Sequence, residues 1–136
     1  MIESRTAIIA ADGTHTYEDL DEASKRVAGA LLGDNEDLNQ TRVAFLVAPS
    51  FAYAAVQRGI WRAGGVAVPL ATSHPPPELE YVIRDAGASV VVADAACATR
   101  VAGLAKAAHA RSAIGRCLKA KQRRPRRKNN SLGRFR

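Results

Sequence analysis

The first 95 residues alternate between stretches with a helical period and short runs of apolar residues. Thr6–Ala10 is short and apolar and is followed by Asp12-Gly13, which indicates a strand that ends in a tight turn. A helix is predicted over Tyr17–Leu32, because Thr16 and Asp19 stand in capping-box register and Gly33 provides a stop. Its apolar positions recur at helical spacing: Leu20, Ala23, Val27, Ala30 and Leu31.

Three apolar runs rich in β-branched residues follow, at Val43–Val47, Val66–Val68 and Ser89–Ala93. None of them alternates with polar residues, so both faces of each strand are expected to be buried. Two helical patterns separate them. Ser50 begins the first and Gly64-Gly65 ends it, whereas prolines begin the second and Gly87 ends it. Single helices between buried strands require parallel pairing, so the pattern predicts a partial doubly wound α/β unit with a mainly parallel sheet and flanking helices.

The pattern weakens after Asp94. The Ala-rich segment 96–111 fits a helix, and residues 112–136 are predicted to be a disordered basic tail. Charge divides the chain at the same place, because residues 1–95 hold 7 basic and 13 acidic side chains whereas residues 96–136 hold 13 basic and none acidic. The net charge of +7 therefore describes neither part, and a nucleic-acid interpretation applies to the tail alone.

A search for chemistry yields few candidates. The chain has neither a dinucleotide-binding glycine fingerprint nor a phosphate-binding loop with Lys, and Ser50 and Ser73 lack a nucleophile elbow. His74, before three prolines, is the one candidate for a ligand contact, although a surface histidine without a role is the commoner case. Cys97 and Cys117 have no metal-ligand spacing and are interpreted as incidental thiols in a reducing compartment. Tyr53 and Trp61 are expected to pack against a neighbouring layer.

A family resemblance rests on three blocks of sequence. Thr16–Leu20, Arg42–Leu46 and above all Gly64–Leu70, followed by His74-Pro75 and Glu78–Ile83, resemble the beginning of the AMP-forming acyl-CoA synthetases, within the adenylate-forming ligase superfamily. The run from Gly64 to Asp85 is most similar to the malonyl-CoA synthetase branch. The resemblance covers about residues 5–95, which would form the amino-terminal part of an AMP-binding domain.

The resemblance implies ATP-dependent activation of a carboxylic acid to an acyl-adenylate and then to an acyl-CoA in fatty acid metabolism, and the branch similarity points to malonate as the acid. ATP, Mg²⁺ and coenzyme A are the cofactors that the family uses. Because the family's catalytic motifs are absent from the sequence, no catalytic, cofactor-binding or metal residue is assigned, and the chain alone is expected to be inactive. We expect an amino-terminal fragment whose tail arises from a shifted reading frame or a retained intervening sequence.

Two alternatives remain open. The first is a small non-enzymatic α/β module that binds nucleic acid weakly and nonspecifically through its basic tail. The second is a free-standing dinucleotide-binding domain, which the missing glycine fingerprint disfavours. We find no targeting sequence and no apolar run long enough to span a membrane, so an intracellular protein is expected. The acyl substrate, the compartment and the oligomeric state do not follow from the sequence.

Overall fold

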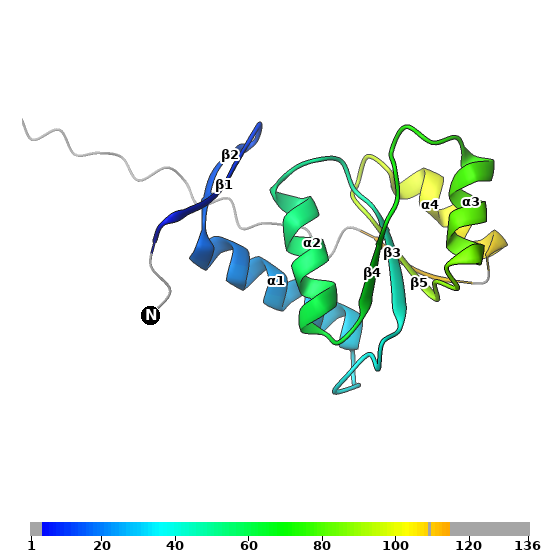
Figure 1. Ribbon diagram of the computed structural model, residues 1–136, viewed down its shortest axis with the longest axis horizontal. Helices are drawn as coiled ribbons and strands as arrows, with labels where there is room; N and C mark the ends of the chain where they lie inside the picture. The colour runs from blue at the N-terminus through cyan, green and yellow to red at the C-terminus, as the bar shows by residue number, and fades with distance from the viewer. Residues whose placement is uncertain (1–3, 109, 115–136) are drawn as a thin grey trace, which may run out of the picture.

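The computed structural model describes residues 4–108 and 110–114 of the 136-residue chain (Figure 1). In chain order the described elements are β1 Thr6–Ala10, β2 Gly13–Thr16, α1 Tyr17–Leu32, β3 Arg42–Leu46, α2 Phe51–Arg62, β4 Val66–Pro69, α3 Pro76–Asp85, β5 Val90–Ala93, α4 Ala98–Ala107 and β6 Arg111–Ile114. The predicted helix at Tyr17–Leu32 is confirmed, and the three predicted apolar runs form β3, β4 and β5.

The start of α1 shows why its prediction succeeded. The Thr16 hydroxyl accepts the Asp19 backbone N–H at 3.1 Å, and the Asp19 carboxylate accepts the Thr16 N–H at 2.9 Å. This capping box satisfies two amides that the first helical turn leaves without a partner. At the other end, the Gly33 N–H donates to the Gly29 carbonyl at 3.1 Å. Both signals are local in sequence and can be read without the fold.

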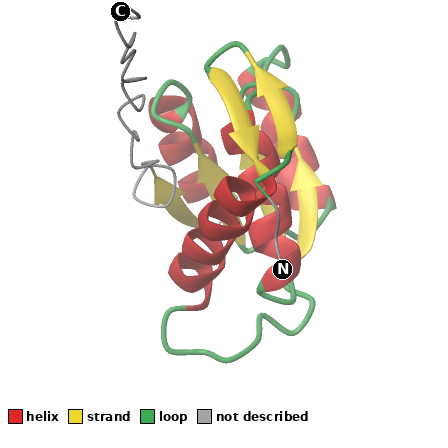
Figure 2. Ribbon diagram, turned by 90° about the vertical axis from the view of Figure 1, so that its left-hand side faces the viewer, coloured by secondary structure: helices red, strands yellow, loops and turns green. Residues whose placement is uncertain are grey.

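Four strands form a parallel sheet in the order β4-β3-β5-β6. The first strand of the sheet, β3, thus lies between β4 and β5 and pairs with both, so that the chain adds β4 on one side and then β5 and β6 on the other. This arrangement confirms the predicted doubly wound α/β class. The β1–β2 hairpin is antiparallel and forms a separate sheet near the start of α1 (Figures 1 and 2).

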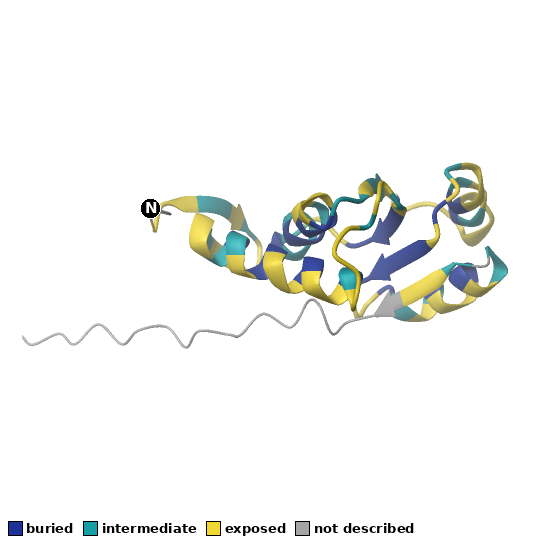
Figure 3. Ribbon diagram, turned by 90° about the horizontal axis from the view of Figure 1, so that it is seen from below, coloured by how far each residue is buried: buried dark blue, intermediate teal, exposed yellow. Residues whose placement is uncertain are grey.

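Helices cover both faces of the parallel sheet, and the buried residues of β3 alternate between them (Figure 3). Val43, Phe45 and Val47 pack with α1 and α2, whereas Ala44 and Leu46 pack with α3 and α4. The residues of β3 from Val43 onward and all of β5 are buried, as the unbroken apolar runs predicted. The same prediction is wrong for β4, whose Val66 and Pro69 are exposed because this strand lies at the end of the described sheet. The core therefore consists of two layers, one on each side of the sheet.

The helix predicted in the Ala-rich segment is present as α4, and its Val101, Leu104 and Ala105 are buried against the sheet. The strand β6 was not predicted. Residues 112–114, assigned to the tail from the sequence, belong to this strand, which pairs with β5. The rest of the predicted tail lies outside the described residues.

Two arginines tie this part of the chain to the core. The Arg84 guanidinium on α3 donates to the Ala107 carbonyl at the end of α4 at 2.6 Å, and Arg111 on β6 donates to the Leu31 carbonyl at the end of α1 at 3.4 Å. A cation at a helix carboxyl end satisfies an unpaired carbonyl and complements the helix dipole. The segments 98–108 and 110–114 are thus part of the fold and not an appendage.

The two aromatic residues of α2 differ in their surroundings. The Tyr53 ring is half-buried and meets the Phe45 ring edge-on, with 5.0 Å between centroids, as expected for packing against the sheet. Trp61 is 59% exposed, so the expectation that it packs against a neighbouring layer is wrong within the described residues. The preceding residue, Ile60, is buried in the core, so Trp61 lies off the helix face that covers the sheet.

Candidate functional site

The carboxyl ends of β3 and β5 are the place where this topology favours a ligand. From β3 the chain adds β4 on one side and then β5 and β6 on the other, so the strand order reverses between β3 and β5. Open parallel sheets bind ligands at such a point. Leu46 at the end of β3 is paired with Ala93 at the end of β5. The loops that follow, residues 47–50 and 94–97, lead into the amino ends of α2 and α4. We take these loops as the candidate site.

The Asp94 carboxylate bridges these two loops. Its Oδ2 accepts the Ala48 backbone N–H at 3.1 Å, and its Oδ1 accepts the Cys97 backbone N–H at 2.9 Å. The Cys97 amide lies at the N-cap of α4, where backbone N–H groups can bind an anion, whereas the Ala48 amide lies in the loop before the N-cap of α2. In this protein the side chain of Asp94 uses both amides. The switch point of the sheet is therefore closed by an internal carboxylate.

Ser50 caps α2 at the same edge. Its Oγ accepts the Tyr53 N–H at 3.3 Å and donates to the Ala48 carbonyl at 2.9 Å. Both contacts of the hydroxyl are local and structural. The role of Ser50 in the structure is that of a helix cap, in agreement with the predicted start of this helix.

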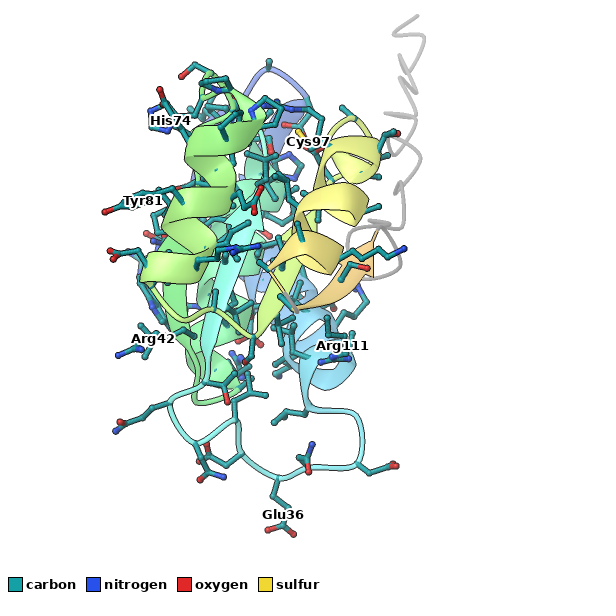
Figure 4. All side chains as sticks on the ribbon, turned by 90° about the vertical axis from the view of Figure 1, so that its right-hand side faces the viewer. Glu36, Arg42, His74, Tyr81, Cys97 and Arg111 are labelled. Atoms are coloured by element: carbon teal, nitrogen blue, oxygen red, sulfur yellow. The ribbon has the colours of Figure 1, made fainter. Side chains whose placement is uncertain are left out.

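Cys97 lies buried at the start of α4, next to Asp94 (Figure 4). Burial raises the pKa of the Cys97 thiol, and the neighbouring Asp94 carboxylate raises it further. A raised pKa keeps the sulfur protonated near neutral pH, and the thiolate is the reactive form of cysteine. This environment is the opposite of the one that activates a cysteine nucleophile. Cys117 lies outside the described residues.

His74 is exposed in the loop between β4 and α3, at the same end of the molecule as Cys97 (Figure 4). Its Nδ1 lies 3.8 Å from the Glu78 carboxylate, one turn further along the chain. Its backbone carbonyl accepts an N–H of Arg100 at 2.8 Å. The loop places His74 at the carboxyl edge, as predicted, but its side-chain contact is with a neighbouring surface carboxylate.

A hollow in the described surface lies at the other edge of the sheet and is lined by Asp37, Asn39, Gln40 and Gly64. Those residues precede β3 and β4, so they meet the amino ends of the strands. Gly64 has a φ of +82°, and a Cβ added there would lie 2.2 Å from the Asp37 Oδ1. Gly64 therefore permits a tight turn against the loop that contains Asp37, and the glycine pair follows the end of α2, as the sequence predicted.

Within the described range, no group of three His, Cys, Asp or Glu side chains is arranged to hold a metal ion. The amides at the switch point are engaged by Asp94. Asp94 and Arg100, which order this edge, were missed as site residues from the sequence, although an acidic residue directly after a buried strand is a usable signal.

The family of the chain is shown by sequence comparison. The family model described as AMP-binding enzyme matches residues 3–133. The chain belongs to the AMP-binding enzyme family. Members of this family are AMP-forming ligases, and the resemblance noted in the sequence is thereby confirmed.

Curated relatives of the family include mitochondrial malonate–CoA ligases of animals. That of Xenopus laevis is 40% identical over 99 residues, which cover 69% of this chain and 17% of the relative. The human protein is 42% identical over 96 residues, which cover 65% of this chain and 16% of the relative. The chain thus spans about a sixth of the length of these relatives.

Solved structures agree with this assignment. Apo MatB from Rhodopseudomonas palustris is 30% identical with a TM-score of 0.70, and the match covers 82% of this chain and 22% of MatB. A benzoate–CoA ligase from Burkholderia xenovorans LB400 is 27% identical with a TM-score of 0.69, over 84% of this chain and 23% of that protein. The described fold corresponds to the amino-terminal part of the adenylate-forming fold.

None of the helices in the part of the chain that the structure describes is long and apolar enough to cross a membrane.

Proposed function

We propose that this chain forms the amino-terminal part of the structural scaffold of an AMP-forming acid–CoA ligase that acts on malonate. The observation that carries the proposal is the 40% identity to a malonate–CoA ligase over 99 residues. The 30% identity to MatB at a TM-score of 0.70 supports it from the fold. In such a ligase the acid carboxylate attacks the α-phosphorus of ATP, pyrophosphate leaves, and the sulfur of coenzyme A then displaces AMP from the acyl-adenylate.

The contribution of this chain to that reaction is structural. ATP, Mg²⁺ and coenzyme A would supply the leaving group, the charge neutralisation and the acceptor thiol. Transfer at phosphorus needs donors and cations aimed at the transferring group. The described residues instead provide a buried sheet, two helix layers and loops held by internal contacts. We therefore propose that the chain alone does not activate an acid.

A chimera tests the assignment to malonate. Residues 4–114 of this chain replace the matching segment of Rhodopseudomonas palustris MatB, and formation of malonyl-CoA is measured. We expect activity within about tenfold of MatB, since a shared scaffold preserves the position of groups located elsewhere. The matched control carries the corresponding segment of the Burkholderia benzoate–CoA ligase. A folded chimera that makes benzoyl-CoA but no malonyl-CoA would contradict the proposal.

The basic residues after position 95 favour a second candidate function, electrostatic binding of nucleic acid. We predict for that candidate that duplex DNA binds at low salt and that affinity falls steeply as salt rises. Removal of residues 115–136, which hold 10 basic side chains, would abolish the binding, whereas removal of residues 1–3 would not. Fluorescence anisotropy at two salt concentrations measures it. This function would be excluded if the chain still bound DNA without residues 115–136, or if its affinity did not change with salt concentration.

A further inference from the structure

The loops at the carboxyl edge of the sheet bury few apolar side chains. Residues 71–78, which comprise the loop after β4 and the first three residues of α3, are all exposed, whereas Leu70 and Leu79 on either side are buried. Ala48 and Pro49 after β3 are exposed as well. Hydrophobic burial therefore fixes the ends of these loops and not their middles. A loop of this kind opens locally unless polar contacts hold it.

Arg100, in the first turn of α4, supplies such a contact to the loop after β4. Its Nη1 donates to the Thr72 carbonyl at 3.0 Å and its Nη2 donates to the His74 carbonyl at 2.8 Å. One planar guanidinium thus joins two carbonyls that lie two residues apart. Hydrogen bonds from a charged donor are stronger than neutral ones, and the rigid fork of Arg fixes both acceptors together.

Asp94, just before α4, supplies the matching contact to the loop after β3. Its carboxylate accepts N–H groups from Ala48 and from Cys97, so one side chain joins the loops that follow β3 and β5. Asp94 and Arg100 flank the amino end of the same helix. Together they connect the start of α4 to the loops after all three of the strands β3, β4 and β5.

We propose that Asp94 and Arg100 are positioning residues that hold these three loops in one arrangement at the edge of the sheet where ligands of this fold bind. Neither is a catalytic residue, because each acts through the backbone of another segment. Their importance for acid activation rests on the proposed function. The hydrogen bonds of Asp94 and Arg100 to the three loops do not rest on it, because their effect on the loops can be measured without any ligase reaction.

Amide hydrogen exchange of the full 136-residue chain, followed by mass spectrometry, tests the role of Arg100. In R100A we expect the peptide spanning residues 71–78 to exchange about tenfold faster or more, with an unchanged melting temperature, because only local opening is affected. R100K, which keeps the charge without the fork, should fall between R100A and the wild type. R58A, at an exposed arginine on α2, is the matched control and should leave the loop unchanged.

A second variant tests Asp94 independently. D94N keeps the size of the side chain but leaves a single neutral acceptor oxygen, so it can hold only one of the two amides firmly. We expect faster exchange at Ala48 or Cys97, again without global unfolding. Wild-type protection of the 71–78 peptide in R100A, or of both amides in D94N, would overturn the proposal. If the two variants behave as expected but the MatB chimera is inactive, the result would count against the ligase assignment alone.

Discussion

Asp21 on α1 lies between two cations that tie α1 to its own next turn and to α2. The Lys25 ammonium lies 2.9 Å from its carboxylate, and the Arg62 guanidinium of α2 is hydrogen-bonded to it. The hydrogen bond from Lys25 is the largest cause of the lowered pKa of the Asp21 carboxyl. Burial opposes it as the next largest effect, and the charges of Lys25 and Arg62 add to the lowering. The ionised carboxylate is therefore the form that the fold favours.

This pKa shift gives a pH dependence with a defined sign. A carboxyl whose pKa is lower in the folded state stabilises the fold above its unfolded pKa and loses that contribution as pH falls through the folded value. We predict that the urea midpoint of the wild type falls more than that of D21N between pH 6 and about pH 3, a window that spans the unshifted value of 3.8. E22Q, at the exposed neighbouring position, should behave like the wild type. Parallel acid losses in wild type and D21N would contradict the prediction.

Residue-level chemistry was predictable only where partners are close in sequence. The pairing of Thr16 with Asp19 was read directly from spacing of three residues. The contact of Asp94 with Ala48 spans 46 residues, and that of Arg100 with His74 spans 26. Such contacts depend on the strand order, which a pattern of apolar residues does not specify. The sequence therefore located the edge of the sheet but not the side chains that order it.

At the level of elements, α1 and α2 approach each other closely through Gly59. A Cβ added at Gly59 would lie 2.5 Å from the Val27 Cβ and 3.0 Å from the Ser24 carbonyl oxygen on α1. These distances are shorter than real side-chain contacts, so one helix would have to move. Gly59 thus permits the packing that buries Val27, Leu31, Val56 and Ile60.

We predict that G59A destabilises the protein by about 1–3 kcal/mol, as expected for overpacking of a well-filled core. The matched control is G29A on α1, where an added Cβ meets nothing within 4 Å. Alanine favours a helix over glycine, so G29A should stabilise by up to about 1 kcal/mol. Chemical denaturation measures both. Equal effects of the two substitutions would show that helix propensity, and not the approach of α1 to α2, decides the outcome.

The elements differed in how far the sequence predicted them. Helices with caps and strands with unbroken apolar runs were found within a residue or two, because their signals are local. The strands β2 and β6, of four residues each, were missed. Gly13–Thr16 carries no apolar run, and Arg111–Ile114 begins with a charge and a serine. Each is a strand because a neighbouring strand offers it a hydrogen-bonding edge.

At the scale of the whole molecule, the change of charge at Asp94 is not the end of the fold. The helix α4 contributes buried residues to the core, and β6 extends the sheet beyond β5. The animal malonate–CoA ligases cover 65–75% of this chain, the MatB structure covers 82%, and the family model matches residues 3–133. Similarity to the family thus continues past Asp94 in both sequence and fold. Of the 13 basic side chains after residue 95, Arg100 and Arg111 donate hydrogen bonds to backbone carbonyls of other elements of the fold.

We propose that this chain supplies the scaffold for acid activation and not the activation itself. Malonate-dependent exchange of labelled pyrophosphate into ATP, measured on the purified 136-residue chain with Mg²⁺, tests it most directly. Intact MatB is the positive control, and the chain without malonate gives the background. We predict exchange at background for the chain and strong exchange for MatB. Malonate-dependent exchange by the chain above that background would show that it performs the adenylation step and would contradict the account.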